Sequence, residues 1–193
     1  MQKITTPCVI LAGGKSSRLG QDKTQIHFGG YPLSQWLVMR FENMCENLYV
    51  SAKQRDKFNF HAEFLIEKSP IYAPLVGMIN AFTLLDSKEI IFLSVDTPFI
   101  SQETLLALDS KDSPIVYAQS EFKAHYLISK WQRSTLDSLL WAYKSKSYAL
   151  HRIVESHLHE IVPISEEEGL NINTMQDYEN ALLRLDKLNE LKG

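Results

Sequence analysis

The stretch CVILAGGKSSRLGQDKT, residues 8–24, joins a short apolar run to a turn that is rich in glycine and in cations. Its first five residues, CVILA (8–12), are all apolar or small, which is typical of a strand buried on both faces of a sheet. The two adjacent glycines that follow allow backbone N–H groups to approach an anion closely, and Lys15, Arg18 and Lys23 add positive charge. The pattern predicts a phosphate-binding loop at the end of the first strand. Composition alone leaves a flexible, solvated loop open as the alternative.

Two common phosphate loops do not fit this stretch. A P-loop needs a Lys directly after its second glycine, but Gln21 and Asp22 intervene before the Lys here. The Rossmann fingerprint needs glycines in the order G-x-G-x-x-G, and residues 13–18 do not have that order. The loop therefore belongs to another class of phosphate site.

Strand-like and helix-like segments alternate along the rest of the chain. Short apolar runs bounded by polar turns occur at 8–12, 48–52, 63–67, 90–95, 114–118, 125–129 and 160–164. Apolar residues at helical spacing lie between or after these runs, at 33–44, 75–85, 101–109, 134–145 and 174–188. The alternation predicts one α/β domain over residues 1–193, with a doubly wound, mainly parallel sheet and helices on both faces. In such sheets ligands bind at the carboxyl ends of the strands, where the strand order switches.

Composition limits the classes of partner. The chain has 193 residues and a formal net charge of −3, so it has no overall basic field for nucleic acid. Cys8 and Cys45 have neither metal-ligand spacing nor a disulfide pattern, and we expect reduced thiols. No apolar stretch approaches the ~20 residues that a membrane span needs, and no secretory segment precedes the glycines. These features predict a cytoplasmic protein without nucleic-acid or membrane partners.

A second unusual segment, IIFLSVDTPFI at 90–100, places Asp96 just after a buried strand, where Pro98 stops the strand from continuing. A single carboxylate at such a position is often a turn former or a helix cap. Opposite a cationic glycine loop, however, it is also well placed to hold Mg²⁺, which prefers one or two carboxylates together with phosphate oxygens and water. Both interpretations stay open on the residues alone.

The order of residues at 11–23, L-A-G-G-x-S-x-R-L-G-x-D-K, resembles the signature loop of nucleotidyltransferases that use nucleoside triphosphates. Within that superfamily the chain is similar to the molybdenum cofactor guanylyltransferase (MobA-type) family. The family's later motifs follow in the same order, as P-L-x-G at 74–77, D-T-P at 96–98 and N-I-N-T at 171–174. The resemblance implies a Rossmann-like nucleotidyltransferase fold.

The resemblance also implies an activity and a set of site residues. The expected reaction transfers GMP from GTP to the terminal phosphate of molybdenum-molybdopterin and releases pyrophosphate, with Mg²⁺ as cofactor. Molybdoenzyme apoproteins or their chaperones are candidate partners for the product. The resemblance assigns catalysis to Arg18, Lys23 and Asp96, the metal to Asp96, and molybdopterin binding to Asn171 and Asn173. It assigns nucleotide binding to Leu11, Ala12, Gly13, Gly14, Lys23, Ser51, Lys68 and Asp96.

The chain departs from the family pattern at two nucleotide positions. Ser51 stands where the family usually has Asn, and Lys68 aligns with a position that is commonly acidic, with Glu67 one step earlier. Two alternatives to the guanylyl enzyme stay open. One is a cytidylyltransferase for the same cofactor or another member of the superfamily, although Gly13 favours the guanylyl form because the cytidylyl loop usually reads L-A-A-G. The other is a nucleotide-binding protein without catalytic activity.

His125 lies on a later strand, near a segment where the family often has His-Pro. A single histidine on a strand is more often packed and hydrogen-bonded than catalytic. We therefore predict a structural role for His125.

Overall fold

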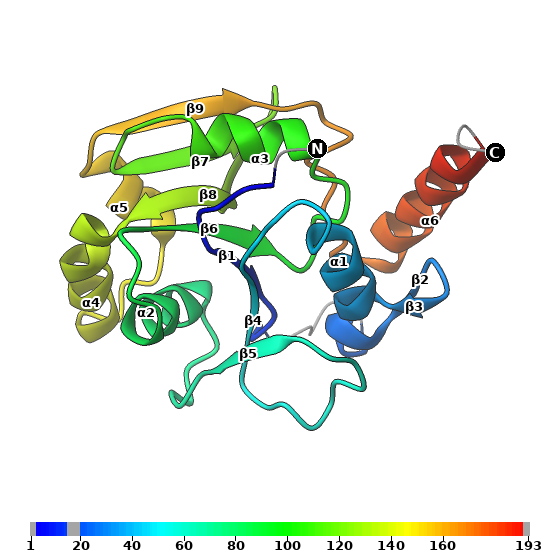
Figure 1. Ribbon diagram of the computed structural model, residues 1–193, viewed down its shortest axis with the longest axis horizontal. Coiled ribbons are helices and arrows are strands. Elements are labelled where there is room, and N and C mark those ends of the chain that lie inside the picture. The colour runs from blue at the N-terminus through cyan, green and yellow to red at the C-terminus, as the bar shows by residue number, and fades with distance from the viewer. Residues whose placement is uncertain (1–2, 15–19, 191–193) are drawn as a thin grey trace.

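The computed structural model describes residues 3–14 and 20–190, and its central feature is a seven-stranded sheet with strand order β5-β4-β1-β6-β8-β7-β9 (Figure 1). The strands are β1 (Cys8–Leu11), β4 (Leu48–Ala52), β5 (Glu63–Ile66), β6 (Glu89–Ser94), β7 (Ile115–Gln119), β8 (Ala124–Gln132) and β9 (His159–Pro163). Every pairing in this sheet is parallel except those of β8, which runs antiparallel to both β6 and β7. The prediction of a mainly parallel α/β sheet is confirmed.

Helices cover both faces of the sheet. The core on one face includes residues of α1 (Leu33–Phe41), α3 (Gln102–Asp109) and α6 (Met175–Glu190). The core on the other face includes residues of α2 (Pro74–Leu84), α4 (Leu136–Lys144) and α5 (Leu150–Glu155). Two short 3-10 helices, η1 (Lys23–Gln25) and η2 (Arg133–Thr135), complete the helical segments of the described residues.

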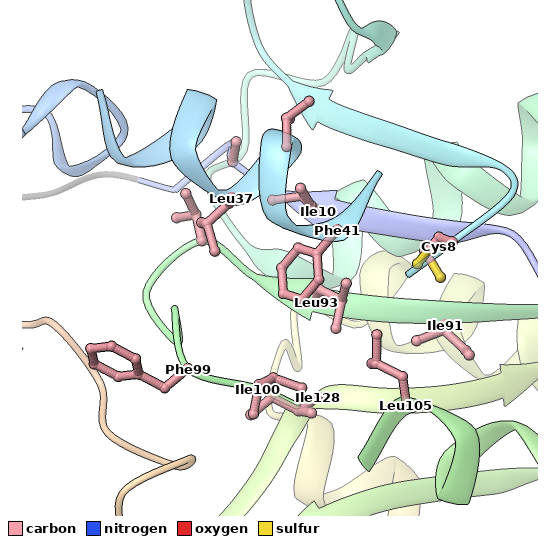
Figure 2. Packing of buried hydrophobic residues seen from close by; sticks show 14 of the residues in the cluster. Cys8, Ile10, Leu37, Phe41, Ile91, Leu93, Phe99, Ile100, Leu105 and Ile128 are labelled. Carbon is pink, nitrogen blue, oxygen red and sulfur yellow. The ribbon is translucent and has the colours of Figure 1, made fainter. Parts of the chain in front are cut away.

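The apolar run of β1 explains why helices pack against both faces of the sheet. Cys8 and Ile10 belong to the core that includes α1 and α3, whereas Val9 and Leu11 belong to the core that includes α2 and α4. Figure 2 shows the first of these cores, where Phe41 of α1 lies over the strand residues. Side chains alternate across a strand, so a strand that is apolar at every position can bury all of them only between two helical layers. The run CVIL therefore decides the architecture.

The strand order switches direction at β1, which pairs with β4 on one side and with β6 on the other. The chain passes from β1 to β4 and β5, and it then returns across β1 to form β6. Leu11 lies opposite both Ser51 and Ser94 in the register. The segments that follow β1, β4 and β6 therefore leave the sheet side by side, at the edge where doubly wound proteins bind ligands.

Several elements differ from the sequence expectation. A hairpin of β2 (His27–Phe28) and β3 (Tyr31–Pro32) was not expected, although its turn, Gly29 and Gly30, has φ angles of 58° and 88° that favour glycine. Helix α1 ends at Phe41 instead of continuing to residue 44. The six-residue helix α5 is separate from the predicted helical segment at 134–145.

Two further observations concern membrane-spanning helices and the two cysteines. Among residues 3–14 and 20–190, no helix combines the length and the apolar character that crossing a bilayer requires. Cys8 and Cys45 are both free thiols and both buried.

Candidate active site

Three side chains from distant parts of the chain meet at the carboxyl edge of the sheet. The Lys23 ammonium donates to Asp96 Oδ2 at 3.2 Å and to Asn173 Oδ1 at 3.0 Å. The Lys23 and Asp96 side chains are only 11% and 18% exposed, so this ion pair is largely shielded from solvent. The glycine-loop segment, the end of β6 and the late N-I-N-T segment therefore converge on one point.

The end of β6 holds the Asp96 carboxylate in a fixed direction. Oδ1 accepts a hydrogen bond from Ser94 Oγ at 2.5 Å and one from Asn171 Nδ2 at 3.3 Å. The backbone also contributes, because Ile172 N donates to the Asp96 carbonyl at 2.8 Å. The late segment is thus attached to Asp96 through both a side chain and the main chain.

Asp22 positions the start of η1 and so positions Lys23. Its Oδ1 accepts from Thr24 N at 3.0 Å, which caps the short helix, and its Oδ2 pairs with Lys57 Nζ at 2.8 Å. Burial raises the pKa of the Asp22 carboxyl, but the hydrogen bonds from Lys57 and Thr24 outweigh it and leave the pKa below its ordinary value. Asp22 is therefore a charged anchor at neutral pH. Arg18, which the sequence also assigns to this loop, lies outside the described residues.

A cavity of about 530 Å³ opens beside the glycine loop, on the β4 side of β1. Its lining includes Ala12, Gly13, Gly14, Lys53, Lys57 and Tyr72. Small-molecule sites usually have volumes of about 300–1,000 Å³, so the cavity is large enough for a nucleotide. Leu11, at the last position of β1, is buried and is not among the lining residues.

Glu67 lies behind this cavity and is bound on both of its oxygens. Ser51 Oγ donates to Oε1 at 2.9 Å, and Lys53 Nζ pairs with Oε2 at 2.7 Å. A Cβ atom at residue 13 would lie 2.4 Å from Glu67 Oε1, so the close approach of the loop to this carboxylate requires Gly13. Ser51, the departure from the family's Asn, is fully buried as a partner of Glu67.

Lys68, the next residue, is exposed to solvent, whereas Glu67 is buried. Both residues line a separate hollow of about 220 Å³, together with Asn80 and Tyr143. The acidic residue at the end of β5 that adjoins the glycine loop is Glu67. Of the two registers that the sequence left open, the closeness of Glu67 to Gly13 favours the one that is shifted by one residue, while nucleotide binding by Lys68 stays a prediction.

A second cavity, of about 270 Å³, lies on the other side of Asp96, between the end of β6 and the start of β8. Because β8 runs antiparallel, its first residues reach the same edge as the carboxyl ends of the neighbouring strands. His125 lines this cavity and is 5% exposed. Burial lowers its pKa, and the charge of Lys123 lowers it further, so the ring is neutral at pH 7. The predicted packed state of His125 agrees with this burial, but sequence reasoning did not place it beside Asp96.

The residues around Asp96 suit a hard cation. The ammonium of Lys23 already lies between a carboxylate oxygen and an amide oxygen, those of Asp96 and Asn173, and such oxygens are the ligands that Mg²⁺ prefers. Among the described residues, no group of three His, Cys, Asp or Glu side chains could hold a metal by itself. A magnesium ion here would need water or phosphate oxygens of the substrates to complete its shell.

Helix α6 begins with a capping box that fixes the N-I-N-T segment. Asp177 Oδ2 accepts from the backbone N–H groups of Asn173 and Thr174 at 3.0 and 2.8 Å, and Thr174 Oγ1 accepts from Asp177 N at 3.2 Å. The sequence pattern, Thr174 followed three residues later by an acid, predicted this arrangement. The box holds Asn173 within reach of Lys23.

We expect Asp177→Ala to lower the free energy of unfolding by about 1 kcal/mol at neutral pH, which urea denaturation would measure. Burial raises the pKa of Asp177, but the hydrogen bonds from Thr174 and Asn173 outweigh it and lower the pKa below 3.8. A carboxyl whose folded pKa is lowered stabilises the protein above its ordinary pKa, and this contribution is lost as the pH falls below about 4. The difference between the two proteins should therefore shrink at pH 3. An equal difference at pH 7 and pH 3 would contradict the role of the charged box.

Comparisons with known proteins identify relatives of this chain. A family model described as the MobA-like NTP transferase domain matches residues 8–161. A protein of Helicobacter pylori strain 26695 named molybdenum cofactor guanylyltransferase is 37% identical over 190 residues, which cover 94% of each chain. An Aquifex aeolicus protein named probable molybdenum cofactor guanylyltransferase is 28% identical, over 94% of this chain and 92% of that protein.

Solved structures show the same fold. Molybdopterin-guanine dinucleotide biosynthesis protein A of Archaeoglobus fulgidus superposes with a TM-score of 0.82 at 18% identity, covering 94% of this chain and all of that one (100%). The 2-C-methyl-D-erythritol 4-phosphate cytidylyltransferase of Thermus thermophilus superposes with a TM-score of 0.71 at 14% identity, over 93% and 98% of the two chains. At these identities the likeness concerns the fold. The family model and the sequence relatives show that this chain belongs to the MobA-like NTP transferase family.

Proposed function

We propose that this protein transfers GMP from GTP to the terminal phosphate of molybdenum-molybdopterin, forming the guanine dinucleotide of the cofactor and releasing pyrophosphate. The observation that carries the proposal is the cluster of Lys23, Asp96 and Asn173 between two cavities. A transferase that joins two substrates needs one site for each of them and shared charged groups where they meet. The names of the sequence relatives support this choice of substrates.

The proposed reaction is an in-line displacement at the α-phosphorus of GTP. A phosphate oxygen of molybdopterin forms the new P–O bond, and the bond between the α-phosphorus and the oxygen bridging to the β-phosphate breaks, so that pyrophosphate leaves with the electron pair. A phosphate nucleophile is ionised at neutral pH, so the reaction needs no side chain as a general base. Catalysis then rests on positioning the substrates and on stabilising negative charge.

The charged residues have distinct tasks in this scheme. We assign Lys23 and Arg18 to the triphosphate and to the leaving pyrophosphate, and the backbone of 11–14 to the nucleotide. Asp96, held by Ser94 and Asn171, is the residue that would bind Mg²⁺. When bound there, the metal would neutralise charge on the phosphate oxygens.

The base is best accommodated in the cavity beside the glycine loop. Gly13 and Lys53 line this cavity and adjoin Glu67, and a carboxylate accepts hydrogen bonds well from the N–H groups on the edge of guanine. We assign Asn171 and Asn173 to the molybdopterin side, where their amides face Asp96 and Lys23. We place the reaction in the cytoplasm, with a molybdoenzyme apoprotein or its chaperone receiving the product.

The test is pyrophosphate release with GTP, CTP or ATP as the nucleotide, in the presence of molybdopterin and Mg²⁺. We expect release with GTP that depends on molybdopterin and is lost when EDTA removes the metal. Preference for CTP would instead indicate the cytidylyl enzyme for the same cofactor. Nucleotide binding without pyrophosphate release from any of the three would indicate a protein that has kept the fold and lost catalysis.

A further inference from the structure

The second cavity is lined by a cationic side chain, that of Lys123, which has no role in the reaction as described above. Lys123 lies in the turn between β7 and β8 and lines this cavity with Asp96, His125 and Asn171. Among the described residues that line it, Lys123 is the one Lys or Arg. Its side chain is exposed to solvent, so an incoming ligand can reach it.

Lys123 is held in a defined position beside Asp96. Its Nζ donates to Asn171 Oδ1 at 2.9 Å, and the Nδ2 of the same amide donates to Asp96 Oδ1 at 3.3 Å. The turn that carries Lys123 is fixed as well, because Ser120 N donates to the Lys123 carbonyl at 2.9 Å and Phe122 N donates to Glu166 Oε1 at 3.1 Å. One amide therefore separates this lysine from the carboxylate at the centre of the site.

Asp96 thus has a lysine on each side. Lys23 contacts Oδ2 from the side of the glycine loop, and Lys123 reaches Oδ1 through Asn171 from the side of the second cavity. Strand order explains the arrangement, since the loop follows β1 whereas Lys123 precedes β8, and β6 with Asp96 lies between them. The two cations flank the point at which a transferred phosphoryl group would have to lie.

The second cavity needs a cation if its ligand is a phosphate. A phosphate monoester carries close to two negative charges at pH 7, and the Asp96 carboxylate would repel it. The other lining residues include Leu127, Ile128 and Leu150, which offer apolar surface to a ring system but no compensating charge. A lysine is a compact point charge that binds phosphate oxygens well.

We propose that Lys123 binds the terminal phosphate of the second substrate and positions it for attack on the α-phosphorus of the nucleotide. This inference rests on the proposed function, and it adds a residue for the acceptor phosphate. Asn171 has the matching task of presenting Lys123 to the cavity. The Lys123–Asn171 hydrogen bond is then replaced by a contact with phosphate when the acceptor binds.

The main experiment compares steady-state kinetics of Lys123→Gln, Lys123→Arg and Lys88→Gln with the unchanged protein. Lys88 is an exposed lysine just before β6, at the opposite edge of the sheet, and serves as the matched control. Gln can still donate a hydrogen bond to Asn171, so that change isolates the charge. We expect Lys123→Gln to raise the KM for molybdopterin about tenfold or more while the KM for GTP changes less than about twofold. Lys123→Arg should restore most of the affinity, and Lys88→Gln should have no effect.

A binding measurement separates this inference from the proposed function. Inorganic phosphate is titrated calorimetrically onto the GTP-saturated protein, and Lys123→Gln should weaken its binding about tenfold whereas Lys88→Gln should not. Phosphate binding that depends on Lys123, in a protein that transfers no GMP, would overturn the proposed function and leave the anion site standing. If Lys123→Gln changes neither phosphate binding nor the KM for molybdopterin, or raises both KM values equally, the role of Lys123 is wrong.

Discussion

Replacing Asp96 with Asn should lower kcat for pyrophosphate release by about 10²–10³-fold or more and remove its dependence on magnesium. Asn has nearly the same shape as Asp, so it can keep the contacts with Ser94 and Asn171 while it loses the negative charge. The loss should therefore concern the metal and the phosphates more than the fold. Initial rates over a magnesium titration, together with the melting temperature, measure the two effects separately.

The matched control for this change is Asp86→Asn. Asp86 is exposed and precedes β6 at the amino edge of the sheet, away from the site. Its replacement should leave both rate and stability unchanged. If Asp96→Asn retains turnover that rises with magnesium as in the unchanged protein, Asp96 is not the metal ligand.

Removing the side chain of Lys23 should have the largest effect on nucleotide affinity. We expect Lys23→Ala to raise the Kd for GTP about tenfold or more, because a charge-assisted hydrogen bond to phosphate is worth roughly 1.5–3 kcal/mol. The buried position of the ammonium strengthens this expectation, since solvent screens it little. Equilibrium titration with GTP, at fixed magnesium, gives the Kd directly.

Lys88→Ala controls for the loss of one positive charge from the protein, because this lysine lies at the opposite edge of the sheet. Its Kd for GTP should match that of the unchanged protein. An unaltered Kd in Lys23→Ala would show that Lys23 only neutralises Asp96 and does not bind the triphosphate.

The architecture could be predicted because its signals are local. The run CVIL is apolar at every position, and such a strand has to lie between two helical layers. The direction of β8 could not be predicted, because antiparallel and parallel strands can share the same apolar pattern. The helix α5 is only six residues long, which is too short to display a full apolar periodicity. The Gly29–Gly30 pair did carry a hairpin signal that the sequence interpretation did not use.

The sequence could predict which residues of the candidate site lie together where a motif marks them, but not where only the topology brings them together. Lys23, Asp96 and Asn173 stand in recognisable patterns, and the structure brings them together. Lys123 belongs to no such pattern, and it reaches the site only because β8 reverses direction. The choice between Glu67 and Lys68 depends on one step of register, which a sequence without a structure does not settle.

The contact between Lys23 and Asp96 has a consequence for the order of events. Because the ammonium group of Lys23 already contacts the carboxylate, a divalent ion that binds Asp96 would have to displace it. Phosphates that attract Lys23 would release the carboxylate for the ion. By thermodynamic reciprocity, each of the two ligands then strengthens the binding of the other. The resting protein should thus take up metal weakly on its own and readily as the chelate of a nucleoside triphosphate.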